Sequence, residues 1–310
     1  MLDHKQSCRS EKCSIYYLTV VIFLLFAPAL LQAKEVTHQF HGLTLNANLE
    51  LAEGRVLTDG VVLILHGIMG HNRMEIIETT QQALLDNDRS SLAINLSLSM
   101  NNRHGFFDCT WPHHHVQDDA IDEISVWVGW LRDQGVTRVI LMAHSRGANQ
   151  AMVYAVDNKD PEVTQLIFLA PGTFDDSNQQ FANRYGNHFG KLMAKAQKNI
   201  STGMGNQIME KTDFWFCPQA KVTADSFVSY YSDKSRFRNF QSYLPRITVP
   251  TLITTGTQDE RQPDIKKHVY PYVDGKLVRL SVIEGADHFF RDFNIEEAME
   301  AAVEFLQNTE

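Results

Sequence analysis

The stretch VILMAHSRG at residues 139–147 decides how the rest of the chain is interpreted. Its first four residues are apolar, which is typical of a buried strand, and a plausible helix follows from Ala148 onward. A serine at a sharp turn between a strand and a helix exposes its hydroxyl, and the helix N-terminus favours negative charge beside it. Ser145 is therefore the candidate nucleophile, and any partners must come from other segments.

The composition is that of an ordinary globular protein with an acidic balance. The chain has 310 residues, of which 44% are hydrophobic and 21% are charged, and its formal net charge is −9. This length suffices for one large or two modest domains with a substantial core. Because no basic block occurs, the sequence argues against a nucleic-acid partner.

The first 33 residues have the composition of a secretory signal. Three basic residues precede an apolar run at residues 15–31, and the small residue Ala33 closes the segment. This order predicts cleavage near Ala33, and an uncleaved membrane anchor is the alternative because the apolar run is long. We therefore expect a periplasmic or secreted protein, or one anchored through residues 1–33 that faces the non-cytoplasmic side.

The cysteines bear on the same compartment. Cys8 and Cys13 would leave with a cleaved signal, so Cys109 and Cys217 would remain. An even number of cysteines in an oxidising compartment suits a disulfide between these two residues. The sequence leaves two isolated thiols equally open, because it does not give the distance between them.

Strand-like and helix-like segments alternate through most of the chain. Continuous apolar runs predict strands, and an alternating segment at residues 41–51 is suited to an edge hairpin. Apolar residues at helical spacing, such as Ile121, Ile124 and Val128, predict helices between the strands. The pattern predicts an α/β fold with a mostly parallel sheet covered by helices on both faces. The predicted strands lie at residues 61–65, 91–96, 139–142, 166–170, 251–255 and 277–283.

Two helix starts carry a recognisable local pattern. Asn72 with Glu75, and Asn294 with Glu297, have the spacing of a capping box ahead of apolar residues. In that motif the first side chain accepts a hydrogen bond from the helix backbone and the second side chain reaches back. We therefore expect helices to begin at Asn72 and Asn294.

One stretch interrupts the alternation. Residues 173–247 contain no clear strand, and aromatic and apolar residues recur at four-residue spacing, as at Phe181, Tyr185 and Phe189. We interpret this stretch as an inserted, mainly helical cap over the carboxyl ends of the strands, where ligands collect in such sheets. The core would then comprise residues 34–172 and 248–310, and most cap aromatics would pack in the cap's own core.

Two later strand ends supply the residue types that activate a serine. The hydroxyl needs a base, usually histidine, and a carboxylate that orients the base. Asp259 and His288 each follow a different predicted strand. Glu260 and Asp287 are rival carboxylates. Asp259 is preferred over Asp287 because a neighbour of the histidine in sequence usually points elsewhere.

Together these motifs resemble those of the α/β-hydrolase superfamily over roughly residues 40–308. The matching pieces are His66-Gly67 after an early strand, the turn at Ser145, GTQD at residues 256–259 and GADH at residues 285–288. The resemblance implies the α/β-hydrolase fold, a Ser145–His288–Asp259 triad and an insertion where residues 173–247 lie. The chain departs from the family's pattern at Ala143, where glycine is usual, which adds one methyl group.

The resemblance also implies donors for the oxyanion of a tetrahedral intermediate. The residue after the nucleophile supplies one backbone N–H, which is that of Arg146, and the segment after His66-Gly67 supplies the other, for which Ile68 is the best choice. Substrate contacts are expected from four further residues, namely His66, His144, Trp111 and His113.

The histidine run at residues 113–115 is the one motif that suggests a metal. Histidines followed by Asp118 and Asp119 are residue types that bind metal ions, and His113 and His115 would share one face of an extended loop. A serine triad needs no metal, so we expect neither a metal nor a cofactor here. Loop hydrogen bonding or a pocket wall is the preferred interpretation.

These residues predict a secreted or periplasmic serine hydrolase that cleaves a carboxylic ester of a small-molecule acyl substrate through an acyl-enzyme. A thioesterase, a peptidase or an acyltransferase would use the same triad and stays open. A catalytically silent binding protein with the same fold is the alternative of another class, because fold alone does not fix function. Such proteins usually lose a triad member, whereas Ser145, His288 and Asp259 are all present.

Overall fold

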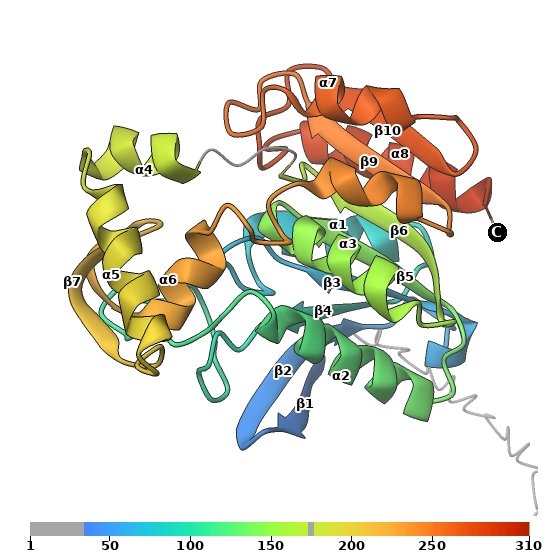
Figure 1. The fold of residues 1–310 in the computed structure, drawn as a ribbon. Coiled ribbons are helices and arrows are strands. Elements are labelled where there is room, and N and C mark those ends of the chain that lie inside the picture. The colour runs from blue at the N-terminus through green and yellow to red at the C-terminus, as the bar shows by residue number, and fades with distance from the viewer. Residues whose placement is uncertain (1–33, 173–176, 310) are drawn as a thin grey trace, which may run out of the picture. The chain divides into compact units, whose positions relative to one another are not determined.

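The computed structural model of the chain describes residues 34–172 and 177–309 (Figure 1). The predicted signal segment, residues 1–33, lies outside the described residues. Within the described ranges, no helix has the length and apolar character needed to cross a membrane.

The central sheet has eight strands in the order β1-β2-β4-β3-β5-β6-β9-β10. Residues 41–51, predicted as an edge hairpin, supply only its turn and its second strand, and the first strand, at residues 34–40, was not predicted. The antiparallel pair is extended by β4, and from β4 onward neighbouring strands run parallel. The mostly parallel sheet predicted from the apolar runs is thereby confirmed. The strands are β1 (Lys34–Phe40), β2 (Leu43–Glu50), β3 (Val61–Leu65), β4 (Ser91–Asn95), β5 (Val139–His144), β6 (Val163–Leu169), β9 (Thr251–Gly256) and β10 (Val278–Ile283).

Helices cover both faces of this sheet (Figure 1). Along β3, Val62 and Ile64 pack into one core with α1 (Glu75–Leu85) and α8 (Asn294–Gln307). Leu63 and Leu65 pack into the other core with α2 (Asp119–Asp133) and α3 (Arg146–Asn158). Because successive side chains of a strand point to opposite faces, both faces must be apolar, which explains the continuous apolar runs. Short helical segments lie at η1 (Leu57–Asp59), α7 (Ile265–Val269) and η3 (Tyr270–Tyr272).

The two predicted capping boxes are wrong. Helix α1 begins at Glu75, and Asn72 lies outside it, where its side-chain amide donates to the carbonyl of Ala93 at 3.2 Å. Asn294 is already inside α8 and donates to the carbonyl of Arg291 at 2.8 Å. In both cases the side chain takes a partner other than the helix N–H groups, which the local pattern does not reveal.

The insert contains a strand hairpin besides its helices. Its described elements are α4 (Ser177–Tyr185), α5 (Phe189–Ser201), β7 (Ile208–Phe214), β8 (Cys217–Thr223), α6 (Ala224–Tyr231) and η2 (Phe240–Arg246). The antiparallel pair β7–β8 was not predicted, because its register shifts twice and charged residues interrupt its alternation. The aromatic stripe belongs to two helices, α4 and α5, which are separated at Gly186, where φ is 88°.

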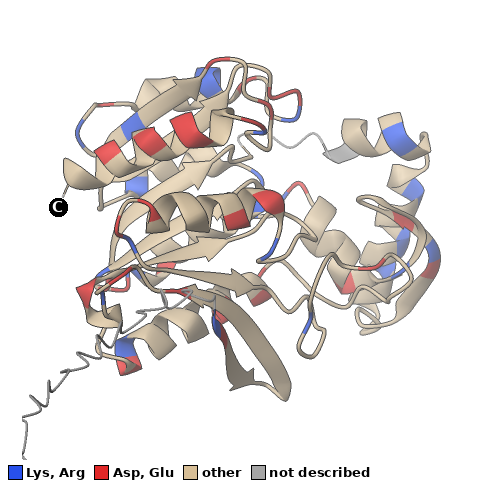
Figure 2. Ribbon diagram, turned by 180° about the vertical axis from the view of Figure 1, so that it is seen from behind, with Lys and Arg blue, Asp and Glu red and all other residues tan. Residues whose placement is uncertain are grey.

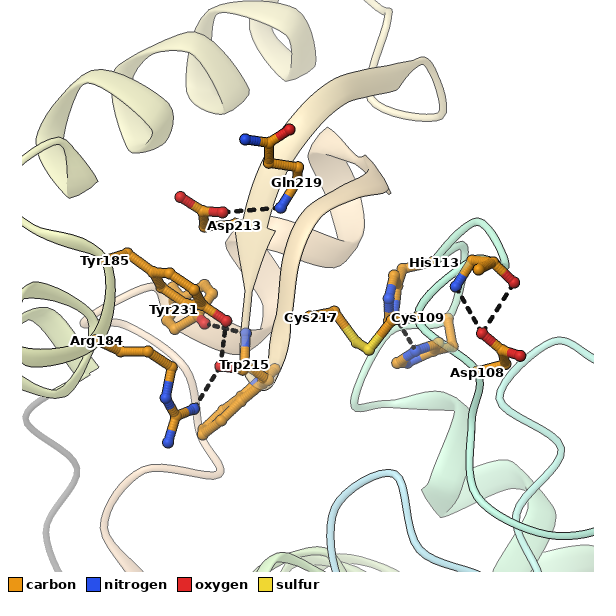
Figure 3. Close-up of a disulfide and its surroundings, with 12 residues drawn as sticks. Asp108, Cys109, His113, Arg184, Tyr185, Asp213, Trp215, Cys217, Gln219 and Tyr231 are labelled. Atoms are coloured by element: carbon orange, nitrogen blue, oxygen red, sulfur yellow. Dashed lines mark hydrogen bonds between the residues drawn. A yellow bond between two sulfur atoms is a disulfide. The ribbon is translucent and has the colours of Figure 1, made fainter.

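The hairpin is attached to the loop between β4 and α2. The backbone N–H of His113 donates to the carbonyl of Lys221 at 2.7 Å, and the N–H of Thr223 donates to the carbonyl of His113 at 3.0 Å. Cys109 and Cys217 form a disulfide across the same two segments, with their Cα atoms 5.1 Å apart (Figure 3). Of the two interpretations left open by the sequence, the structure thus contains the disulfide.

We expect the disulfide to contribute substantially to stability. It closes a loop between residues 108 positions apart, so it limits the freedom of the unfolded chain. The free energy of unfolding of the double variant Cys109→Ser/Cys217→Ser, measured in urea, should be about 2–5 kcal/mol lower than that of wild type. Wild-type protein with reductant should match that variant. Two free thiols at these positions in unreduced, mature protein would contradict the bond.

Candidate active site

Ser145 sits in a strained turn between β5 and α3. Its backbone has φ 53° and ψ −125°, a conformation that costs a non-glycine residue about 1–3 kcal/mol. Two hydrogen bonds hold the turn: the Ser145 N–H donates to the carbonyl of Leu169 at 2.9 Å, and the Ser145 carbonyl accepts from the N–H of Ala148 at 3.0 Å. The strand and the helix therefore fix where the hydroxyl points.

Gly147 allows the turn to approach the end of β3. A Cβ atom at this position would lie 2.3 Å from the carbonyl oxygen of His66, which is too close for any side chain. The unusual Ala143 presents no such conflict, because its methyl group is fully buried in the core between sheet and helices. The turn thus tolerates alanine at 143, whereas position 147 requires glycine.

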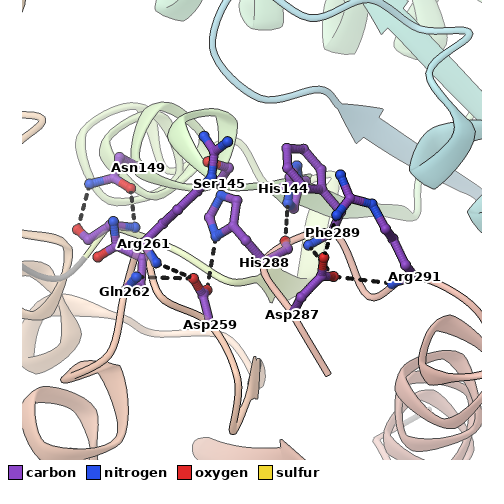
Figure 4. Close-up of polar contacts among 11 residues, drawn as sticks. His144, Ser145, Asn149, Asp259, Arg261, Gln262, Asp287, His288, Phe289 and Arg291 are labelled. Carbon is purple, nitrogen blue, oxygen red and sulfur yellow. Dashed lines mark hydrogen bonds and ion pairs between the residues drawn. The ribbon is translucent and has the colours of Figure 1, made fainter. Parts of the chain in front are cut away.

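The structure brings the three predicted polar residues into one hydrogen-bonded chain (Figure 4). The Nε2 atom of His288 is 2.8 Å from Oγ of Ser145, and its Nδ1 atom is 2.8 Å from Oδ2 of Asp259. The other oxygen of Asp259 accepts the backbone N–H groups of Arg261 and Gln262 at 2.9 and 3.0 Å. An imidazole that receives a proton from Ser145 would therefore face a fixed carboxylate.

Asp259 and His288 are held together by the backbone of their own loops. The N–H of Thr257 donates to the carbonyl of Ile283 at 3.0 Å, and that of Gln258 donates to Ala286 at 2.9 Å. These bonds join the loop after β9 to the loop after β10. The carboxylate is thereby set beside the imidazole before any ligand binds.

In the described structure, neither rival carboxylate takes the place of Asp259 at His288. Asp287 forms an ion pair with Arg291 at 2.8 Å, and Glu260 is exposed. Burial raises the pKa of Asp259, but the hydrogen bond and charge of His288 and the two backbone donors outweigh it, so its pKa is lowered. Asp259 is consequently a carboxylate at neutral pH, which is the form that orients a histidine base.

Two cavities meet at Ser145 and His288. The first, of about 660 Å³, is lined largely by the insert and by the loop after β9. The second, of about 720 Å³, lies between the start of α1, the disulfide and the loop before α8. Ile68, Phe216 and Arg261 also belong to both linings. The hydroxyl is therefore bordered by both cavities.

The two predicted oxyanion donors lie beside this hydroxyl. Arg146 follows Ser145 at the first position of α3, and both Ile68 and Arg146 line the first cavity with Ser145. The loop that carries Ile68 is turned tightly, since the N–H of Gly70 donates to the carbonyl of Gly67 at 3.1 Å. This arrangement puts main-chain segments from both sides next to the serine.

Of the four histidine and tryptophan residues expected near the substrate, His144 is the one that lines a cavity at Ser145. Its Nε2 donates to the carbonyl of His288 at 2.8 Å and so holds the loop of the candidate base. Burial lowers its pKa to about 3. His144 is therefore neutral, and it acts on the position of His288.

His66, Trp111 and His113 are not among the residues that line the two cavities. His66 is buried, and its Nε2 accepts from the N–H of Leu96 at 3.1 Å. Trp111 packs edge-on against Phe107, and His113 is fully buried between the core loop and the hairpin. The substrate contacts expected of these residues thus find no support in the cavities. They fix loops around the site instead.

The histidine run has a structural role. His113 and His115 contact each other through ring nitrogens 3.3 Å apart, and His115 reaches the hydroxyl of Tyr230 at 3.0 Å. Among the described residues, no three His, Cys, Asp or Glu side chains are grouped as metal ligands would be. These histidines join the core loop to α6, which agrees with the preferred interpretation of loop hydrogen bonding.

Several cavity residues escaped the sequence analysis. Arg184, Trp215, Phe216, Arg261 and Phe289 line the space around Ser145. The aromatic content of the insert was a signal for some of them, but not for which rings would face inward. For the two arginines the sequence offers no signal, because surface arginines are common and their direction depends on the packed structure.

The model of a family described as "Protein of unknown function (DUF1749)" matches residues 109–308. Among curated proteins, none matches the sequence.

Solved structures show the fold. Est1E from Butyrivibrio proteoclasticus is 18% identical with a TM-score of 0.61, over 89% of this chain and 98% of that chain. The α/β hydrolase GrgF from Penicillium sp. sh18 is 14% identical with a TM-score of 0.65, over 90% and 99%. An esterase from Pyrococcus furiosus is 19% identical with a TM-score of 0.56, over 90% and 91%. These likenesses confirm the α/β-hydrolase fold that the sequence motifs imply.

Gly147→Ala should destabilise the protein, because the new methyl group would collide with the carbonyl of His66. Overpacking of this kind costs about 1–3 kcal/mol, measured as the free energy of unfolding in urea. Gly129→Ala on α2 is the matched control, since a Cβ there meets nothing within 4 Å. That variant should be about 0.5–1 kcal/mol more stable than wild type. Equal stability of the two variants would contradict the close approach.

The stability of the fold should fall as the pH drops below about 6.5. Burial lowers the pKa of His113 to about 4, so in this pH range the unfolded chain binds a proton that the folded chain does not. Between pH 7 and pH 5, wild type should lose about 2 kcal/mol more unfolding free energy than His113→Gln. His41→Gln, a change at an exposed histidine, should keep the wild-type slope. If the free energy of unfolding of His113→Gln and of wild type changed equally with pH, His113 would not be the source of this pH dependence.

Proposed function

We propose that this chain, which belongs to the DUF1749 family and has the α/β-hydrolase fold, is a serine hydrolase that cleaves carboxylic esters. The observation that carries the proposal is the hydrogen-bonded chain from Ser145 through His288 to Asp259, at the meeting point of two cavities. Nucleophile, base and orienting acid at hydrogen-bond distance are what acyl transfer by a serine requires.

In the first half of the reaction, Ser145 Oγ attacks the carbonyl carbon of the ester while its proton passes to Nε2 of His288. The backbone N–H groups of Arg146 and Ile68 stabilise the negative charge on the carbonyl oxygen. The bond from carbon to the alcohol oxygen then breaks, and His288 gives its proton to the departing alcohol. The acyl group remains on Ser145 as an ester.

In the second half, a water molecule attacks the acyl-enzyme. His288 takes one proton of that water while the water oxygen forms a bond to the carbonyl carbon. The bond to Ser145 Oγ then breaks, Oγ recovers the proton from His288, and the carboxylic acid leaves. Asp259 stays ionised throughout and stabilises the imidazolium that forms twice in the cycle.

We also propose that the protein works outside the cytoplasm. The disulfide between Cys109 and Cys217 supports this location, because such bonds persist in oxidising compartments. The composition of residues 1–33 supports it independently. Whether that segment is removed or kept as an anchor is decided by the N-terminal sequence of the exported protein.

Ser145→Ala should abolish ester hydrolysis, with kcat falling by about 10⁶-fold if the three residues act as a unit. Asp259→Asn should lower kcat by about 10⁴-fold, because the imidazole loses its orientation. The measurement is turnover of a small panel of chromogenic esters, thioesters and aminoacyl amides, together with labelling by a fluorophosphonate probe.

Two control variants sharpen this test. Ser201→Ala changes an exposed serine at the end of α5 and should keep both turnover and labelling. Glu260→Gln should reduce turnover far less than Asp259→Asn. Undiminished labelling of a folded Ser145→Ala protein would remove Ser145 from the mechanism. A panel in which thioesters or amides are turned over and esters are not would overturn the ester assignment.

A further inference from the structure

The first cavity combines aromatic walls with an excess of positive charge. Its charged lining residues, among those described, are Arg146, Arg184, Arg261 and Glu260. Glu260 is thus the one carboxylate that the described lining contributes. The guanidinium of Arg146 lies over the Trp215 ring, 5.1 Å from the ring centre, and Arg146 has further interactions. It is therefore not proposed to bind an anion.

Arg184 lies on α4 and lines this cavity. It donates through Nη1 to the carbonyl of Trp215 at 2.5 Å, and its guanidinium lies 4.7 Å from the centre of the Phe216 ring. Arg184 also forms a side-chain hydrogen bond with Tyr185. Because a guanidinium has five N–H donors, donors remain for another partner. The aromatic ring holds the flat cation in place without neutralising it.

Arg261 reaches the same ring from the core side. Its guanidinium lies 5.8 Å from the centre of Phe216 and 5.1 Å from that of Phe289. The nearby Asp259 is already occupied by His288 and by backbone N–H groups. In the described part of the chain, neither Arg184 nor Arg261 forms an ion pair with a carboxylate at salt-bridge distance.

The charge of Arg184 acts on Arg261. Burial lowers the pKa of Arg261, Asp259 raises it, and the positive charges of Arg184 and Arg291 lower it further. Two like charges placed around one ring repel each other, and the repulsion is stronger where water is partly excluded. An anion between them would remove this cost.

The insert also carries an excess of positive charge, which favours the binding of an anion. Residues 173–247 contain ten Lys and Arg against six Asp and Glu, although the whole chain has a net charge of −9. Figure 2 shows basic residues on α4 and α5, whereas acidic residues gather on α8. A basic cap on an acidic protein raises the local concentration of anions at the cavity.

We propose that Arg184 and Arg261 bind a carboxylate of the substrate, so that the substrates are esters with a negative charge away from the bond that is cleaved. This inference rests on the proposed ester hydrolysis. Guanidinium groups suit carboxylates because paired N–H donors match the two oxygens. The other part of the substrate would occupy the second cavity, whose lining includes the apolar side chains of Met69, Met74, Phe106, Phe289 and Ile295.

The test compares esters that differ in one negative charge. The first pair is 4-nitrophenyl hydrogen glutarate and its methyl ester, which differ by one negative charge in the acyl part. The second pair is 4-acetoxybenzoate and its methyl ester, which differ by one negative charge in the alcohol part. Release of the phenol is followed for wild type, for Arg184→Gln/Arg261→Gln, and for Lys195→Gln, an exposed change on α5 that removes one positive charge.

In at least one pair, wild type should prefer the anionic ester by about tenfold or more in kcat/KM, the size expected for charge-assisted hydrogen bonds. The double variant should lose this preference, and Lys195→Gln should keep it. Using the ratio within a pair removes any general effect of Arg261 on the neighbouring Asp259. The inference is overturned if neither pair shows a preference, or if the preference survives the double variant.

Failure of the proposed ester hydrolysis would look different, since wild type would then turn over no ester in either pair. In that case, binding of 4-acetoxybenzoate to Ser145→Ala protein is measured by calorimetry, with and without the two arginine changes. Binding that weakens about tenfold when the arginines are replaced supports an anion site in a protein that is not an esterase. Equal binding refutes the site.

Discussion

A single close approach, between Gly147 and the carbonyl oxygen of His66, underlies the whole site. It lets the start of α3 come against the end of β3, so that the turn at Ser145 and the loop with Ile68 border the same cavity. The strained backbone of Ser145 is tolerated because the strand before it and the helix after it are both packed in the core. The contact thus brings together the two segments that border the hydroxyl.

The sheet order then decides which loops can meet Ser145. The strands β5, β6, β9 and β10 are consecutive neighbours and run parallel, so the loops at their carboxyl ends lie along one edge. Backbone hydrogen bonds between the last two loops set Asp259 beside His288. The histidine can therefore reach across to Ser145 although 143 positions separate the two residues in sequence.

The parts of the structure that depend on local patterns were predictable from sequence. Apolar runs located the six parallel strands of the sheet but not β1. Short motifs at the strand ends identified Ser145, Asp259 and His288 as neighbours. The capping role of Asn72 was wrong because its side chain found a partner in β4. The hairpin β7–β8 was missed because its irregular pairing leaves no clean alternation. The cavity arginines could not be foreseen, since their direction depends on rings that are distant in sequence.

The meeting of two spaces at one hydroxyl has a consequence for the order of product departure. A molecule split at Ser145 would have its fragments in different compartments, one beneath the insert and one beside the disulfide. The first fragment can then leave without displacing the second, and the volume it vacates admits solvent to the remaining intermediate. In a hydrolase of the proposed kind, the two products would leave through spaces whose linings are shared only in part, at residues such as Ile68, Phe216 and Arg261.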